Sequence, residues 1–138
     1  MHRRLWRRLA DVRIADATAL LAARRYAACY YLAGYAVECA LKACIAGRFR
    51  ANTIPDRSEV NRSYSHDLEQ LVTVAGLQSA LARRRTEDAD FDANWNLVKD
   101  WNVDHRYRLD ITRKDAARLL SAVTDTEHGV LRWLSNYW

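Results

Sequence analysis

Apolar and polar residues along this chain follow the spacing of α-helices, and one segment differs from the rest by being apolar on every side. From Tyr26 to Gly47 the only charged residues are Glu38 and Lys42, four positions apart. A helix that is apolar all round lies inside a globular protein, where charges must be paired or functional. The pattern therefore predicts a buried central helix with a Glu38–Lys42 pair across one turn. Gly34 in its middle indicates close contact with a neighbour, since glycine is unfavourable there.

The flanking segments also predict helices. A first helix is expected from about residue 3 to residue 23, with a change of phase near Asp16 that also allows two shorter helices. Gly47 is expected to end the central helix, and the polar stretch around Pro55 predicts a mobile loop over about 48–64. Because no segment alternates apolar and polar residues convincingly, the predicted fold class is all-α.

Residues that can cap helices divide the second half of the chain. Ser65 is expected to cap a helix that stops at Gly76, and Thr86 is expected to cap the next one. Thr112 and Asp115 form a capping box that opens the last helix. The residues expected to face the core here are Phe91, Trp95 and Val98, flanked by Trp101, and then Ala116, Leu119, Leu120, Val123, Val130, Leu131 and Leu134.

The size of the chain fits a single domain spanning residues 1–138, because half of the residues are hydrophobic. Glu38 and Lys42 near the middle of the central run argue against a membrane span. Cys29, Cys39 and Cys44 lie too far apart along one helix to bridge one another. With no secretory signal at the start, a cytoplasmic, reduced protein without metal or other cofactor is expected.

The net charge of +5 is concentrated at the start of the chain, in a basic N-terminal helix over residues 1–25. This segment holds seven arginines and two aspartates, whereas residues 86–104 hold six acidic residues and one lysine. Arginine contacts phosphate through a planar fork. The candidates for nucleic-acid binding are therefore Arg3, Arg4, Arg7 and Arg8, and the alternative is a solvated helix face. The basic and acidic segments could also meet, within a subunit or between subunits.

Three short segments, in order along the chain, resemble one known family. They are residues 30–43 (YYLAGYAVECALKA), the sequence Ser65-His66-Asp67-Leu68, and the pair Arg106-Tyr107. Together they are similar to the HEPN domain, a helical module of prokaryotic nucleotidyltransferase partners, toxins and defence systems. The resemblance implies an up-and-down bundle of four to five helices that forms a homodimer. It also implies binding of RNA, a nucleotide or a partner protein, such as a nucleotidyltransferase in a toxin–antitoxin or defence system.

The ribonuclease members of that family carry an arginine, then four to six residues, then a histidine. No arginine stands at these positions before His66, His105 or His128. The first hypothesis is therefore a binding module without ribonuclease activity.

Two alternatives stay open at this point. Cleavage of RNA without metal needs a base, an acid and a cation, which His105, Arg106 and His66 would supply in a rearranged endoribonuclease site. The other alternative is a purely structural dimerisation domain. In the structural interpretation of the same region, Arg106 pairs with the carboxylate of Glu38 inside the bundle. The members of this polar core network would be Glu38, Lys42, Arg106 and Tyr107.

Overall fold

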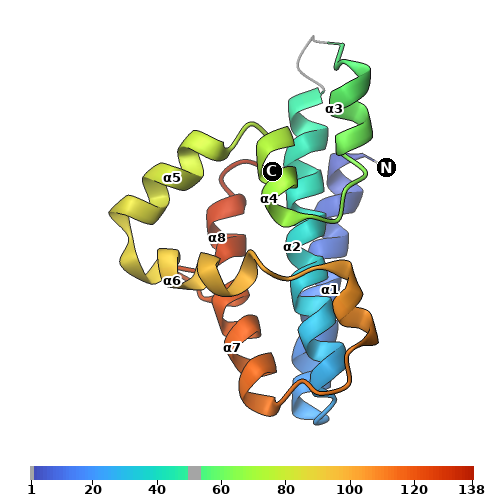
Figure 1. Cartoon of the computed structure of the whole chain (residues 1–138), viewed down its shortest axis with the longest axis vertical. Helices are drawn as coiled ribbons and strands as arrows, with labels where there is room; N and C mark the ends of the chain where they lie inside the picture. The colour runs from blue at the N-terminus through green and yellow to red at the C-terminus, as the bar shows by residue number, and fades with distance from the viewer. Residues whose placement is uncertain (1, 50–53) are drawn as a thin grey trace.

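The chain forms a helical bundle, shown in Figure 1, and the computed structural model describes residues 2–49 and 54–138. Within these residues no strand is present, so the all-α prediction is confirmed. The elements are α1 (Arg3–Ala22), α2 (Tyr26–Phe49), α3 (Arg57–Arg62), α4 (Leu68–Val74), α5 (Gln78–Glu87), α6 (Ala89–Val98), the 3₁₀ helix η1 (Val103–Tyr107), α7 (Arg113–Thr124) and α8 (Val130–Leu134).

The two longest helices, α1 and α2, lie side by side and antiparallel along the long axis of the molecule (Figure 1). α1 continues through Asp16, whose carboxylate accepts a hydrogen bond from Arg13 at 2.6 Å, so the alternative of two shorter helices is wrong. α2 also continues past Gly47, because this glycine does not adopt the left-handed conformation that ends a helix.

The prediction of a buried central helix is confirmed. Most residues from Ala33 to Ile45 are buried, and α2 contacts α1, α4, α7, α8 and η1. Gly34 makes the expected close contact, because the indole of Trp101 lies directly against it. A β-carbon built on Gly34 would be 2.2 Å from Cδ1 of Trp101. The small residues of α2 thus allow a large aromatic side chain to reach its backbone.

The predicted loop over 48–64 is wrong for much of its length. Arg48 and Phe49 still belong to α2, and α3 occupies 57–62, while residues 50–53 lie outside the described part of the chain. α3 forms because Asp56 and Glu59 make a reciprocal capping box, in which Asp56 accepts from the Glu59 N–H at 2.8 Å. The residues around Asp56 and Glu59 are also polar, so their composition predicts a loop although the capping box forms a helix.

Two of the predicted helix boundaries need correction. Asp67 caps α4 by accepting from the Gln70 N–H at 3.1 Å, whereas Ser65 accepts from the Asp67 N–H before the helix begins. Thr86 lies inside α5, where its hydroxyl donates to a carbonyl of its own helix. The residue that caps α6 is Asp88, whose carboxylate accepts a hydrogen bond from the Phe91 N–H at 3.0 Å.

Other boundaries agree with the sequence. Gly76 ends α4 with a φ of 73°, and the capping box of Thr112 and Asp115 opens α7. The last predicted helix is divided into α7 and α8 by a turn in which Asp125 accepts backbone N–H groups. With the break at Asp88, this turn produces more helical segments than the four to five expected.

The core lies between α2 and the helices of the second half of the chain. The predicted ridge of Phe91, Trp95 and Val98 is fully buried, as is almost all of the predicted apolar face of α7 and α8. The acidic residues of α6 pair with α5, since Arg85 contacts Asp92 at 2.5 Å. In the described residues, the N-terminal arginines take no part in these pairs. None of the helices in these residues has the length and apolar character required to cross a bilayer.

Gly34→Ala is expected to lower the free energy of unfolding by about 1–3 kcal/mol, the usual cost of overpacking a core. The new methyl group would overlap the buried indole of Trp101. Urea unfolding followed by circular dichroism measures this change. Gly47→Ala is the matched control, because its methyl group would meet only the flexible side chain of Arg3, at 3.2 Å, and should leave stability unchanged or higher. Equal stability of Gly34→Ala and wild type would contradict the close contact.

The ion pair between His128 and Asp88 is expected to make stability depend on pH. The hydrogen bond between them raises the pKa of His128 from its ordinary value of 6.5 and lowers that of Asp88 from 3.8. The stabilisation by His128 is fully present below pH 6.5 and is lost as pH rises through the raised pKa. The stabilisation by Asp88 is present above pH 3.8 and is lost as pH falls through the lowered pKa.

His128→Gln should therefore destabilise the protein more at about pH 5.5 than at about pH 8.5, measured by urea unfolding at both values. His2→Gln, which removes an exposed imidazole that forms no ion pair in the described residues, is the control. An equal effect of His128→Gln at both pH values would be evidence against the charged pair.

Candidate functional site

The central polar feature of the molecule is the carboxylate of Glu38, which is 1% exposed on the inner face of α2. One of its oxygens accepts a hydrogen bond from Nδ1 of His66, at the start of α4, and lies 4.0 Å from Nζ of Lys42. The predicted pairing of Glu38 with Lys42 is therefore present, with His66 as the closer partner. Burial of a carboxylate is costly without such partners, so this triad ties α4 to α2.

The prediction that Arg106 and Tyr107 belong to this polar core network is wrong. Both side chains are exposed at the end of η1, where the guanidinium of Arg106 stacks 4.8 Å above the ring of Tyr107. The face of α2 next to Glu38 is occupied by Trp101, which packs on Gly34 one turn earlier. The side chain of Arg106 thus lies outside the polar network of Glu38.

The three candidate catalytic residues are not assembled into one site. His66 contacts Glu38, whereas the ring of His105 packs against Tyr30 with 5.1 Å between centroids. Tyr30 and Glu38 are eight residues apart, which is about 12 Å along the axis of α2. His105 also accepts a hydrogen bond from the Asn102 N–H at 3.0 Å and thereby caps η1. These contacts with Tyr30 and Asn102 give His105 a structural role in η1.

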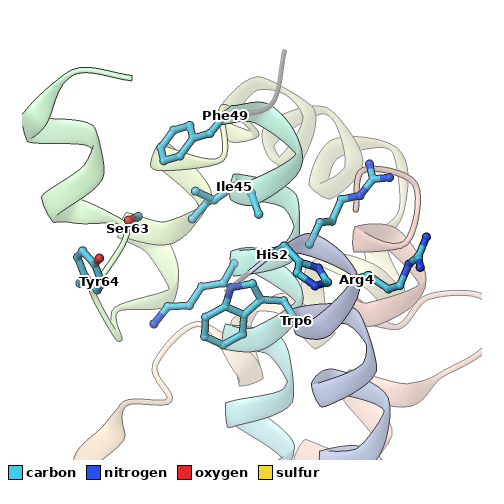
Figure 2. A pocket seen from close by; sticks show the side chains of 10 residues that line it. His2, Arg4, Trp6, Ile45, Phe49, Ser63 and Tyr64 are labelled. Carbon is cyan, nitrogen blue, oxygen red and sulfur yellow. The ribbon is translucent and has the colours of Figure 1, made fainter. Parts of the chain in front are cut away.

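A deep cleft lies between the N-terminal half of α1, the C-terminal half of α2 and the connection from α3 to α4 (Figure 2). We call it the N-terminal cleft, and its volume is about 910 Å³. Its lining residues are His2, Arg3, Arg4 and Trp6 from α1 and the residue before it, Lys42, Ile45, Ala46 and Phe49 from α2, and Ser63 and Tyr64 from the connection. The cleft thus combines cationic side chains with three aromatic rings.

The walls of the N-terminal cleft are held by contacts that extend from the buried triad. Nζ of Lys42 lies 5.4 Å from the centroid of the Trp6 ring and also contacts Glu38. The side chain of Lys42 is only 12% exposed. Trp6 and Tyr64 stand on opposite walls in Figure 2, with Phe49 at one end. Tyr64 is 74% exposed and is available for a ligand.

The four N-terminal arginines proposed to bind nucleic acid, Arg3, Arg4, Arg7 and Arg8, have different surroundings. Arg3 and Arg4 line the N-terminal cleft, whereas the guanidinium of Arg7 lies 5.4 Å over the ring of Trp138. Arg8 is exposed and does not line the cleft. None of the ion pairs that the described residues form includes any of the four. Arg3 and Arg4 therefore bring uncompensated positive charge to the cleft.

One cluster in the described residues has the geometry of a metal site. Ligand atoms of Asp88, Asp90 and His128 all lie within 4.8 Å of one another. The carboxylate of Asp88 is already occupied, because it caps α6, bonds to His128 at 2.8 Å and lies 3.3 Å from Arg84. These contacts give the cluster a structural role, in which it joins α5 and α6 to the turn before α8.

Sequence reasoning missed His66 as the main partner of Glu38, and it missed the aromatic walls of the N-terminal cleft. Glu38 and His66 are separated by 28 positions, so no local spacing links them. For Trp6 there was a signal, because it is an aromatic residue set among arginines. Comparisons of the chain with protein-family models, with curated proteins and with solved structures found no match.

Glu38→Ala is expected to lower the free energy of unfolding by about 3–5 kcal/mol, because the buried triad would lose its only anion. A double-mutant cycle with His66→Ala should show coupling between the two positions, since their side chains are in direct contact. Urea unfolding of the four proteins provides both numbers. Glu69→Ala, which removes an exposed carboxylate from α4, is the control and should have little effect. A Glu38→Ala variant as stable as wild type would contradict the buried network.

Proposed function

We propose that this chain is a HEPN-like module that binds single-stranded RNA or a nucleotide in the N-terminal cleft, without ribonuclease activity. The observation that supports this function best is the combination of aromatic walls and unpaired arginines in one cleft of about 910 Å³. This volume lies in the range of about 300–1,000 Å³ that is usual for small-ligand sites.

The chemistry of the cleft fits both parts of a nucleotide. Bases stack on aromatic rings without regard to sequence, and Trp6 and Tyr64 present such rings from two sides. Phosphate groups are bound by arginine and lysine, and Arg3 and Arg4 are among the residues that line the cleft. The positive charge of Lys42 is partly compensated by Glu38, so Lys42 positions Trp6 more than it attracts phosphate.

The family resemblance supports the same proposal. Residues 30–43 lie on the central helix α2, and the Ser65-His66-Asp67-Leu68 segment provides both the partner of Glu38 and the cap of α4. As in the family it resembles, the chain would act as a homodimer and pair with a nucleotidyltransferase. A catalytic role has less support, because His66, His105 and Arg106 contact different parts of the molecule.

Binding of a fluorescent single-stranded RNA, measured by anisotropy at several salt concentrations, tests this proposal. The double variant Arg3→Ala/Arg4→Ala is expected to bind more weakly and to reduce the slope of log K against log salt by about 1.4, which corresponds to two phosphate contacts. Trp6→Leu keeps an apolar side chain in the cleft but removes the stacking surface. It should weaken binding roughly tenfold with an unchanged salt slope.

The matched control is Arg132→Ala, which removes an exposed arginine of α8 that does not line the cleft. Competition with AMP distinguishes a nucleotide site, in which AMP displaces the RNA, from a site that requires a polymer. Cleavage is followed in the same samples in the presence of EDTA. RNA affinity that is the same in wild type and in both cleft variants would refute the proposed function.

A further inference from the structure

The corner where α1 turns into α2 contains a second cationic cavity, at the opposite end of α2 from the N-terminal cleft. We call it the corner cavity, and its volume is about 510 Å³. The residues that matter here are Arg24, Arg25, Tyr26, Tyr31, Arg106 and Arg108. We propose that the corner cavity is a separate binding site for a phosphate-bearing ligand.

The first support for this site is its uncompensated charge. Arg108 is neutralised by Asp110, to which it donates two hydrogen bonds of 3.0 and 2.9 Å. Arg24, Arg25 and Arg106 take part in no ion pair with any described residue. Like charges around one cavity repel one another, and an anion bound between them removes this repulsion.

The second support is the conformation of Arg24. Its φ is 62°, the left-handed region that L side chains rarely adopt. The N–H groups of Arg24 and Arg25 donate to the carbonyls of Leu21 and Leu20 and close the last turn of α1. This is the helix-ending motif in which glycine is favoured. An arginine at this position is strained, and backbone strain of this kind is concentrated at functional sites.

The third support is the pairing of a planar cation with an aromatic ring in the corner cavity. The guanidinium of Arg106 lies 4.8 Å over the ring of Tyr107. Tyr31 packs against Tyr35 and against the buried Trp101, with ring centroids 6.2 and 5.7 Å apart. The planar fork of arginine binds a phosphate group through paired hydrogen bonds. The ring of Tyr31 beside it accommodates an attached base or sugar.

The phosphate group could come from a free phosphorylated molecule or from the backbone of RNA, and both sources have the same chemistry at the arginines. Inorganic pyrophosphate and a short single-stranded RNA are therefore used as separate probes, in calorimetry and in anisotropy. Arg24→Gly is the decisive variant. It should raise the melting temperature, because glycine relieves the strain at this turn, and it should weaken binding of the probe roughly tenfold.

A purely structural role for Arg24 would change stability alone, so the opposite directions of the two effects identify a binding role. Arg106→Ala should weaken binding as well, while Arg132→Ala should leave it unchanged. The double variant Arg3→Ala/Arg4→Ala should retain pyrophosphate binding, which separates this site from the N-terminal cleft whatever the outcome there.

Loss of pyrophosphate affinity in Arg24→Gly and Arg106→Ala supports a site for free phosphorylated molecules. If wild type binds no pyrophosphate and only RNA binding is weakened by these variants, the ligand is the phosphodiester backbone. Unchanged affinity for both probes in the two variants, or an equal loss in Arg132→Ala, overturns the proposal.

Discussion

The buried carboxylate of Glu38 is the constraint on which the arrangement of this molecule depends. An isolated carboxylate inside an apolar helix is unfavourable, so the fold must bring partners to it. His66 supplies a hydrogen bond and thereby places the start of α4 on α2, while Lys42 supplies a charge from the next turn. Because Lys42 also lies over Trp6, the same cluster contacts one wall of the N-terminal cleft. The contact of Glu38 with Lys42 thus belongs both to the buried network that stabilises the fold and to the surroundings of the N-terminal cleft.

The small residues of α2 have an equally specific effect. Gly34 allows the indole of Trp101 to rest on the helix backbone, one turn before Glu38. Trp101 fills this space, whereas Arg106, from the 3₁₀ helix that follows, lies at the surface. Residues 101–108 therefore contribute both a core residue, Trp101, and an exposed charged residue, Arg106.

The sequence predicted the features that depend on local periodicity, and it failed where distant contacts decide. The apolar run of α2, the pairing of Glu38 with Lys42 and the capping box at Thr112 all follow from spacings of a few residues. The contact between Glu38 and His66 spans 28 positions and has no local signature. The sequence also led to Arg106 as a partner of Glu38, but its side chain is exposed and stacks on Tyr107, an orientation that no local spacing indicates.

The distribution of charge at the two ends of the bundle follows from the antiparallel pairing of α1 and α2. Their helix dipoles point in opposite directions and largely cancel, so side chains determine the potential at each end. At the N-terminal cleft, Glu38 compensates Lys42 and three aromatic rings form much of the surface, which favours stacking. At the corner cavity, Arg24, Arg25 and Arg106 have no such compensation, which favours phosphate. One helical hairpin therefore presents two surfaces of different chemistry, one with more aromatic side chains and one with more uncompensated arginines.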